Sequence, residues 1–304
     1  MMNIQVIIPV YNPDDRFEQL LTMLQKQSLG ILPVLIIDSG QEHGYRVKLD
    51  RNGIFTIKDI PGKEFNHGGT RQLGIEMFPD KDVYVFLTQD ALLVDEYSIE
   101  RLVASFDNSA IGAAYGRQLP YGNASVFSKM AREYNYGSES CVKSFADRST
   151  YGMKTCFLSN SFAAYRREAI VAAGGFPTDT ILGEDMYVAA KMLMGGWKVA
   201  YVAEACVYHS HNYTVWQEFK RYFDIGVFHS RERWIREAFG HAEGAGLKFL
   251  KMEVKTLCNT VPIRLVEMVI RDGMKYIGYQ LGLHEKWMPK CVKTYISMTK
   301  SYWV

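Results

Sequence analysis

Carboxylates and histidines are the side chains of this sequence best suited to catalysis. Asp90 follows the apolar run Val83–Leu87, where an acid can hold a divalent cation or cap the next helix. His209 and His211 lie two residues apart, so on a strand they share a face, and either could complete a metal set with Asp90. Gly183-Glu184-Asp185 opens a helical pattern, in which one acid can serve as a general base or both can favour the helix N-terminus. These residue types predict cation binding and proton transfer, with helix capping as the alternative.

A second group of residues is suited to binding a base or a phosphate. Asp38 ends the buried run Val34–Ile37, and its carboxylate can accept from a base N–H or cap the following turn. Tyr11 follows Pro9-Val10 and can stack on a nucleobase or pack half-buried. The group therefore predicts a nucleotide site, with turn formation as the alternative.

The segment Phe65-Asn-His-Gly-Gly-Thr-Arg71 opens another helical pattern. Its two glycines can let the backbone approach a ligand, a helix N-terminus favours anions, and Arg71 can fork onto a phosphate. An ordinary Gly-Gly turn with Arg71 in a surface ion pair is the alternative.

The elements that must position these residues alternate along the first half of the chain. Apolar, β-branched runs predict strands and the amphipathic runs between them predict helices. The predicted strands are Ile4–Val10, Val34–Ile37, Phe55–Ile60, Val83–Leu87 and Ile111–Tyr115, and the predicted helices between them are Phe17–Leu24, Gly68–Phe78 and Tyr97–Phe106. Strands that alternate with helices indicate a mostly parallel, twisted sheet, whose ligands bind at the carboxyl ends of the strands. Tyr11, Asp38 and Gln89-Asp90 all stand at such ends.

The second half of the chain shows a different pattern. Residues 120–160 have weak periodicity and predict loops and short helices, whereas Glu184–Met194 is helical and Lys198–Val202 and Ala205–Tyr208 are strand-like. After Thr214 the pattern becomes helical, including an apolar stripe in which Pro262 would introduce a kink: Leu250, Val254, Leu257, Val261, Leu265 and Met268. The sequence therefore predicts an α/β region over 1–212 and a helical region over 213–304.

Composition excludes several classes of protein. Of the 304 residues 48% are hydrophobic and 22% charged, which is a globular composition, and the net charge of +2 speaks against a strongly basic nucleic-acid binder. The five cysteines are dispersed, which argues against a disulfide framework. The sequence shows no G-x-G-x-x-G, P-loop or signal-peptide pattern and no run of 18 apolar residues. We therefore expect a cytoplasmic protein.

The charge is unevenly distributed. From Leu247 onward ten Lys/Arg stand against four Asp/Glu, which gives +6 and leaves −4 for the rest. Such a segment can lie on an anionic membrane surface, which would make the chain a peripheral protein at the inner face of the plasma membrane. A helical bundle packed on the catalytic region and a homodimer interface are the alternatives.

The order of the motifs carries a resemblance that no single motif does. PVYN at 9–12, Asp38, HGGTRQ at 67–72, TQDA at 88–91, GED at 183–185 and HSH at 209–211 together resemble the family 2 inverting glycosyltransferases with a GT-A (Rossmann-like) fold. The TQDA form, FNHGGTR, and RYFDIGVFHSRERW at 221–234 look most like the bacterial rhamnosyltransferases of that family. Those enzymes build O-antigen and other cell-surface polysaccharides from dTDP-L-rhamnose.

The resemblance implies a role for each matching residue. Asp38 would accept the thymine N3–H, Tyr11 would pack on the base, and Pro9 would shape the turn. Arg71, His67 and Gln89 would lie near the donor, and Asp90 with His209 or His211 would hold Mg²⁺ or Mn²⁺. Asp185 would be the catalytic base, supported by Glu184. Trp216 and Trp234 would flank the groove for a saccharide or polyprenyl-linked acceptor.

The chain departs from the family at one informative position. Most members carry Asp-x-Asp where this sequence has Gln89-Asp90-Ala91, so the metal should depend more on the charge of the donor diphosphate. A glycosyltransferase with a UDP-sugar donor and an inactive sugar-nucleotide-binding scaffold are the competing hypotheses, and Glu184-Asp185 speaks against the second.

Overall fold

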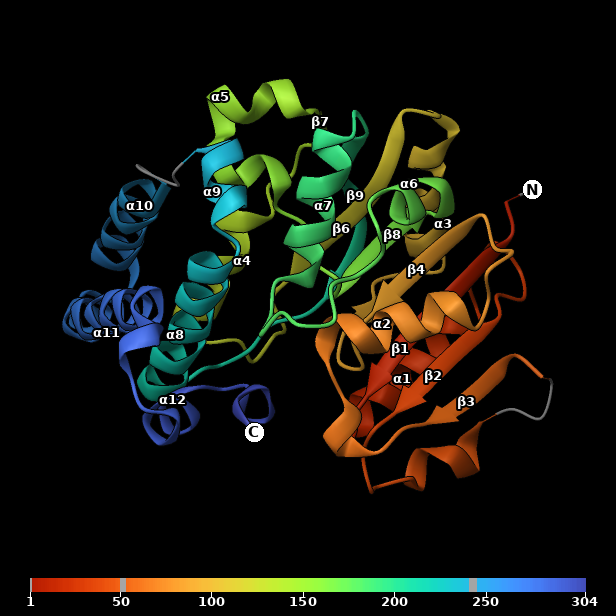
Figure 1. The fold of residues 1–304 in the computed structure, drawn as a ribbon, viewed down its shortest axis with the longest axis horizontal. Helices are drawn as coiled ribbons and strands as arrows, with labels where there is room; N and C mark the ends of the chain where they lie inside the picture. The colour runs from red at the N-terminus through yellow and green to blue at the C-terminus, as the bar shows by residue number, and fades with distance from the viewer. Residues whose placement is uncertain (1, 50–52, 241–244) are drawn as a thin grey trace.

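A computed structural model describes residues 2–49, 53–240 and 245–304. Within them a nine-stranded sheet runs in the order β3-β2-β1-β4-β8-β6-β9-β5, with β7 paired to β9 (Figure 1). The strands are β1 Ile4–Val10, β2 Val34–Asp38, β3 Phe55–Asp59, β4 Val83–Leu87, β5 Leu92–Leu93, β6 Ile111–Leu119, β7 Cys141–Lys143, β8 Phe162–Arg166 and β9 Lys198–Tyr208. The pairs among β1–β4 and the pair β6–β9 are parallel, whereas β5, β7 and β8 pair antiparallel. The predicted α/β class with a mostly parallel sheet is confirmed.

Helices cover both faces of this sheet and continue beyond it (Figure 1). They are α1 Asp15–Leu24, α2 His67–Glu76, α3 Ser98–Val103, α4 Val126–Asn135, α5 Arg148–Tyr151, α6 Arg167–Ala172, α7 Glu184–Met194, α8 Val215–Arg231, α9 Arg233–Phe239, α10 Ala245–Thr260, α11 Leu265–Leu283 and α12 Lys290–Ile296. The helices from α8 onward lie on the side of the molecule away from β3 (Figure 1).

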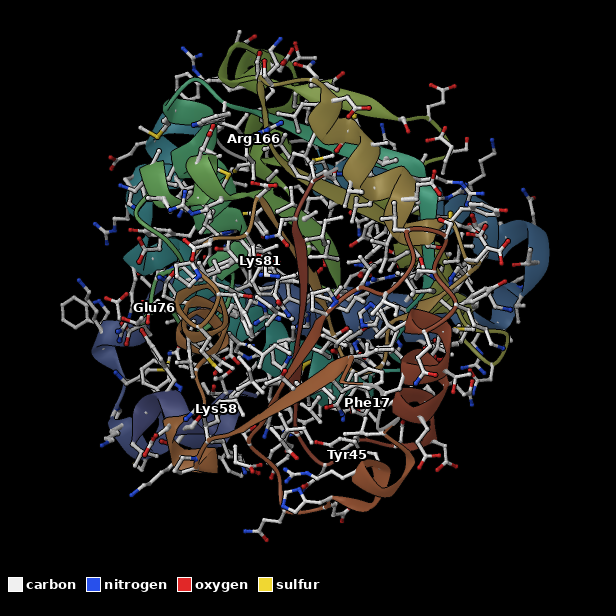
Figure 2. The ribbon with its side chains drawn as sticks, turned by 90° about the vertical axis from the view of Figure 1, so that its right-hand side faces the viewer. Phe17, Tyr45, Lys58, Glu76, Lys81 and Arg166 are labelled. Carbon is white, nitrogen blue, oxygen red and sulfur yellow. The ribbon has the colours of Figure 1, made fainter. Side chains whose placement is uncertain are left out.

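Strand β4 shows why the central strands are continuous apolar runs. Val83, Val85 and Leu87 pack into one core with α1 and α3, while Tyr84 and Phe86 pack into a second core with α2 and α7. Because both faces are covered, no residue of this strand is exposed. On the first side Phe17 of α1 meets Tyr45 edge-on, with ring centroids 5.0 Å apart (Figure 2).

The bounds of two strands between β5 and α8 differ from the prediction. β6 continues to Leu119, four residues past its predicted end, and the two strand-like runs near residue 200 form the single strand β9. A shift in the β6–β9 register, after Gly116, explains the polar interruption in the β9 pattern. The segment 120–160, predicted as loops and short helices, contains the ten-residue helix α4 as its longest element.

The helical stripe predicted across Pro262 is two helices. α10 ends at Thr260, a 3₁₀ turn covers Pro262–Arg264, and α11 follows, because a proline has no N–H for an α-helical hydrogen bond. α11 packs closely on α8: a Cβ on Gly282 would lie 2.1 Å from the carbonyl oxygen of Phe223. Among the described residues no helix is long and apolar enough to span a bilayer.

The boundary predicted after residue 212 falls between β9 and α8. Phe219, Phe223 and Phe228 of α8 are buried in the same core as one face of the sheet. The helical region is therefore packed on the α/β region, and the division into two domains stays a prediction.

Candidate active site

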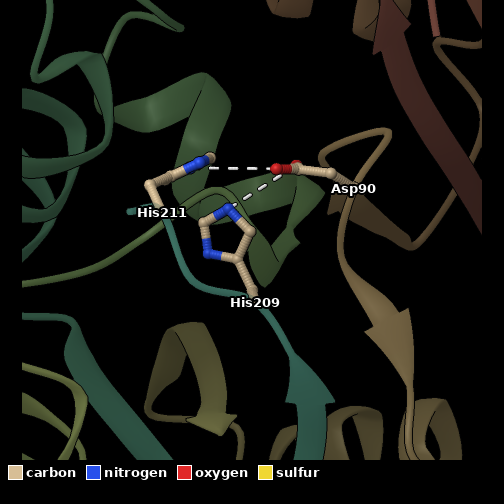
Figure 3. A group of neighbouring side chains, drawn as sticks. All are labelled: Asp90, His209 and His211. Atoms are coloured by element: carbon tan, nitrogen blue, oxygen red, sulfur yellow. Dashed lines mark ion pairs between the residues drawn. The ribbon is translucent and has the colours of Figure 1, made fainter. Parts of the chain in front are cut away.

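Asp90, His209 and His211 converge at the carboxyl ends of β4 and β9 (Figure 3). The Nε2 atom of His209 lies 3.5 Å from Asp90 Oδ1, and Nε2 of His211 lies 3.8 Å from Asp90 Oδ2. The pairing of β5 with β9 explains this meeting, since Leu92, two residues after Asp90, stands opposite Tyr208, which directly precedes His209. One carboxylate and two imidazoles, with ligand atoms within 4.8 Å of one another, form a three-sided donor set for a cation.

Gln118 fixes the orientation of His209. Its amide oxygen lies 2.8 Å from His209 Nδ1 and also accepts from Arg132, while its amide nitrogen donates to Ser159 Oγ at 2.9 Å. The oxygen can only accept, so Nδ1 carries a proton; the Nε2 of the neutral ring is then free to bind a cation, and the Nε2–H of the protonated ring can donate to Asp90. Sequence reasoning missed Gln118 because the predicted strand stopped at Tyr115. A polar residue at a strand end, the signal that identified Asp90, would have found it.

The electrostatics of this cluster keep its members in their metal-binding forms. Burial opposes ionisation of Asp90, but hydrogen bonding and charge from His209, with a further contribution from His211, hold its pKa well below the usual range. Burial and the neighbouring His209 lower the pKa of His211 to about 4. At neutral pH Asp90 is therefore a carboxylate and His211 a neutral imidazole, the forms that bind metals. A mixed oxygen and imidazole set suits Mn²⁺ better than Mg²⁺, which prefers oxygen ligands.

Glu184 and Asp185 begin α7 directly after Gly183, whose φ of +78° makes the turn into the helix. Glu184 is 6% exposed, and its Oε1 is 3.1 Å from Arg71 Nη1. Although burial opposes ionisation, Arg71 and other neighbours lower the pKa of Glu184. Burial and the charge of Glu184 raise the pKa of Asp185 to about 7. The pair thus consists of one acid whose pKa is lowered and one that exchanges a proton near neutrality.

Asn160 holds both acids and was not among the predicted site residues. Its side-chain amide donates to Glu184 Oε1 at 2.9 Å, and its backbone N–H donates to Asp185 Oδ2 at 3.2 Å. The hydroxyl of Tyr165 donates to the Asn160 amide oxygen at 2.6 Å, which fixes the amide orientation. Ser159, the preceding residue, binds Gln118, so the dipeptide 159–160 links the acid pair to the histidine cluster. The weak periodicity of this segment gave no signal for either residue.

The start of α2 is arranged differently from the predicted phosphate cradle. The Asn66 side chain accepts from Gly68 N and Gly69 N at 3.0 and 2.9 Å, so these donors are already occupied. A Cβ on Gly68 would lie 1.7 Å from the carbonyl oxygen of Pro177. The close approach that requires glycine is therefore to the chain itself, and the expected approach to a ligand is corrected.

Arg71 and His67 belong to the first turns of α2, and Arg71 contacts the acid pair through Glu184. Arg71 is 4% exposed and donates to the carbonyl oxygen of His67 at 2.8 Å in addition to pairing with Glu184. Its guanidinium supports the acids and does not present an open fork to a phosphate. His67 is half-buried and meets Phe65 edge-on, and burial lowers its pKa.

Gln89 joins the carboxyl ends of β1 and β4. Its amide accepts from the backbone N–H of Tyr11 at 2.7 Å and donates to the Tyr11 carbonyl at 3.1 Å. Pro9 stands in β1 opposite Ile37 of β2, and the Tyr11 side chain is 61% exposed just beyond. Gln89 thus positions a free aromatic ring, a role that an aspartate, with two acceptors, could not fill.

Asp38 stands at the end of β2, as predicted, but its carboxylate is fully covered. Oδ2 accepts from Tyr45 Oη and Arg46 at 2.7 Å and lies 2.9 Å from His43 Nδ1. Oδ1 accepts from Gly40 N at 2.9 Å. Asp38 therefore orders residues 40–46, and a base reaches it only if one of these donors gives way.

The two predicted acceptor tryptophans lie at opposite ends of α8. Trp216 stacks on Phe219 at the start of α8, with ring centroids 4.7 Å apart. Trp234 lies beyond the other end of α8, where it meets Tyr187 edge-on at 5.2 Å. The 17 residues of α8 span about 25 Å, so the two rings lie at opposite ends of this helix, and their contact with an acceptor stays a prediction.

Comparison with solved structures defines the fold. The fold matches a mannosyltransferase from Pyrobaculum calidifontis, solved with GDP-Man and Mn²⁺, with a TM-score of 0.62 and 16% identity over 99% of this chain and 85% of that one. It also matches S. aureus TarS 1-349, with a TM-score of 0.57 and 13% identity over 98% and 84% of the two chains. At these identities the likeness establishes the GT-A glycosyltransferase fold.

Sequence comparison establishes the family. Residues 85–292 match the family described as Glycosyl transferase family group 2. The chain is 45% identical to the O-antigen chain rhamnosyltransferase RfbN of Salmonella typhimurium over 99% of its length and 96% of that protein. It is 42% identical to the O-antigen chain rhamnosyltransferase WbaN of Salmonella anatum, covering 100% and 96%. The chain belongs to the family 2 glycosyltransferases, and the predicted resemblance is confirmed.

Proposed function

We propose that this enzyme transfers L-rhamnose from dTDP-β-L-rhamnose to a hydroxyl of a saccharide or lipid-linked saccharide during O-antigen synthesis. The rhamnosyl and O-antigen parts rest on the names of relatives that match nearly the whole chain at 42–45% identity. The single observation that carries the chemistry is the linkage of the Asp90–His209–His211 cluster to Glu184–Asp185 through residues 159 and 160.

The residues of this chain divide the reaction between two ends of one site. Asp90, His209 and His211 would hold Mn²⁺, which when bound neutralises the charge that develops on the departing diphosphate. Asp185 accepts the proton of the acceptor hydroxyl that attacks the opposite face of the sugar, and a single displacement inverts the anomeric centre. Glu184, fixed by Arg71 and Asn160, keeps the pKa of Asp185 near neutrality.

Donor recognition is assigned to the carboxyl ends of β1, β2 and β4. Tyr11 stacks on the thymine, in a turn shaped by Pro9 and held by Gln89, and Asp38 accepts the base N3–H in exchange for one of its present donors. His67 lies near the sugar. Because Gln89 brings no charge, metal and dTDP should bind interdependently.

Thermal shifts with TDP, UDP and GDP in the presence of Mn²⁺ test the donor. TDP should raise the melting temperature most, since a ligand stabilises the state that binds it. A larger shift with UDP would assign the enzyme to UDP-sugars. Absence of any nucleotide effect, together with no hydrolysis of dTDP-rhamnose, would favour the inactive scaffold.

The outer face of α11 supports peripheral contact with an anionic membrane at the cytoplasmic side. Val266, Val269 and Tyr276 are 68%, 64% and 65% exposed at helical spacing. The adjacent α10 exposes three lysines: Lys248, Lys251 and Lys255. Each basic residue near such a surface contributes about 1 kcal/mol.

Vesicle co-sedimentation tests this contact. The protein should pellet with phosphatidylglycerol vesicles at low salt and not with phosphatidylcholine, and Val266→Glu/Val269→Glu should stay in the supernatant. Equal behaviour with both lipids would contradict membrane contact, and a concentration-dependent dimer lost in that variant would assign the face to a second copy.

A further inference from the structure

A basic cavity lies outside the catalytic cluster, where the C-terminal ends of α8 and α11 meet. Its volume is about 600 Å³, and it is lined by Ser230, Arg231, Arg233, Glu285, Lys286 and Lys293. Four cations against one carboxylate give the lining a net charge of +3. None of these residues belongs to the donor or catalytic groups described above.

Glu285 organises two of the cations without neutralising the cavity. It is 2% exposed; its Oε1 lies 3.1 Å from Arg231 Nη2, and its Oε2 accepts from Lys293 Nζ at 2.9 Å. Arg231 also donates to the hydroxyl of Tyr302 at 2.7 Å. One buried acid thus holds two cations in fixed positions, and the positive excess remains.

Arg233 and Lys286 supply cations that stay available to a ligand. Both side chains belong to exposed residues, and the Arg233 Nε donates to the Ser230 carbonyl at 3.2 Å. Ser230 is 5% exposed, and its hydroxyl has no hydrogen-bond partner. A buried hydroxyl without a partner is unfavourable, so a ligand with acceptor oxygens would satisfy it.

The negative ends of two helix dipoles offset only part of this positive charge. α8 ends at Arg231 and α11 at Leu283, and each helix C-terminus is equivalent to about half a negative charge. The two ends together offset about one of three positive charges, which leaves an excess suited to a multiply charged anion. Arginine forks match phosphate oxygens in pairs.

The cavity is joined to the catalytic turn through α8. Phe228, two residues before Ser230, packs on Gly183 so closely that a Cβ there would lie 3.0 Å from its ring. Gly183 directly precedes Glu184 and Asp185. The last turns of α8 therefore connect the cavity to the turn that precedes the proposed catalytic base.

We propose that this cavity binds a diphosphate group of the acceptor, so that the enzyme recognises a diphosphate-linked saccharide. The assignment of the ligand as an acceptor rests on the proposed transfer reaction, but binding of a diphosphate to the cavity can be measured without turnover.

Titration calorimetry of the full chain in EDTA tests the proposal with inorganic pyrophosphate and with geranyl diphosphate. EDTA removes divalent cations from the donor site, so that binding there is suppressed. We expect saturable binding that Arg233→Gln/Lys286→Gln weakens at least tenfold, while Lys58→Gln on β3 leaves it unchanged. Equal binding by the double variant and the parent, or no binding by the parent, would overturn the site.

The two probes identify the source of the group. Tighter binding of geranyl diphosphate supports a lipid-linked acceptor, and equal binding supports recognition of the diphosphate alone. Donor hydrolysis assayed in the parent distinguishes this proposal from the proposed function. A parent that hydrolyses dTDP-rhamnose but does not bind pyrophosphate would overturn only the cavity site. A parent that binds pyrophosphate but does not hydrolyse the donor would overturn only the transferase assignment.

Discussion

Asn160 donates its backbone N–H to Asp185, and the same residue donates its side-chain amide to Glu184. Its neighbour Ser159 accepts from Gln118, which holds His209. The acid pair and His209 of the metal cluster are therefore connected through Gln118 and the dipeptide 159–160. This connection is the structural basis for treating cation binding and proton abstraction as parts of one site.

Asp185→Asn should lower kcat by about 10²–10⁴-fold, because the amide cannot accept the acceptor proton. The affinity for dTDP with Mn²⁺, measured by calorimetry, should remain unchanged. Since burial and Glu184 disfavour the charged carboxylate, the variant should melt no lower than the parent at pH 8. Near-parental turnover would remove Asp185 from the role of base.

The pH dependence of turnover follows from the pKa of about 7 for Asp185. A carboxyl whose pKa is raised is protonated below that value and becomes a base only as pH rises through it. At saturating donor and acceptor, kcat should therefore increase between pH 6 and 8 and fall towards tenfold per unit below pH 6. A flat profile from pH 5.5 to 8 would be inconsistent with this carboxyl as the base.

Gln118→Ala should weaken Mn²⁺ binding by about 10–100-fold in the presence of dTDP, because His209 would lose the partner that fixes its tautomer and ring orientation. Gln25→Ala, at an exposed residue that caps the end of α1, serves as the control. The readout is the electron paramagnetic resonance of free Mn²⁺ during titration. Equal affinities in the two variants would show that Gln118 does not position the ligand.

Gly68→Ala should destabilise the fold by about 3 kcal/mol, since its Cβ would overlap the Pro177 carbonyl oxygen. Gly122→Ala is the matched control, because its Cβ would meet no atom within 4 Å. Urea denaturation at pH 7.5 measures both. Similar midpoints for the two variants would contradict the close packing of α2 against residue 177.

Sequence reasoning located the strand-end residues because apolar runs mark buried strands and polar residues mark their ends. Asp90, His209 and His211 meet as expected for that reason. The antiparallel strand β8 escaped prediction, since Phe162–Arg166 is short and contains two alanines, which give a weak strand signal. With β8 unrecognised, the positions of Ser159 and Asn160 at its start could not be inferred.

The face of α2 that is buried also could not be predicted from the sequence. A motif such as HGGTR lists residue types but does not say which face of the helix is buried. Arg71 lies on the buried face with Thr70 and Gly74, so it meets Glu184 and not the solvent. Pairing of this kind depends on how α2 and α7 pack together, a long-range relationship that no local pattern encodes.

One site at the carboxyl ends of β4 and β9 should bring a metal-bound donor to Asp185. A crystal structure with Mn²⁺ and dTDP, with anomalous diffraction recorded for manganese, tests it most directly. The account predicts an anomalous peak about 2.0–2.3 Å from Asp90 and at least one of the two histidines, with the diphosphate facing Asp185. A manganese peak elsewhere, or a diphosphate separated from Asp185 by protein, would contradict it.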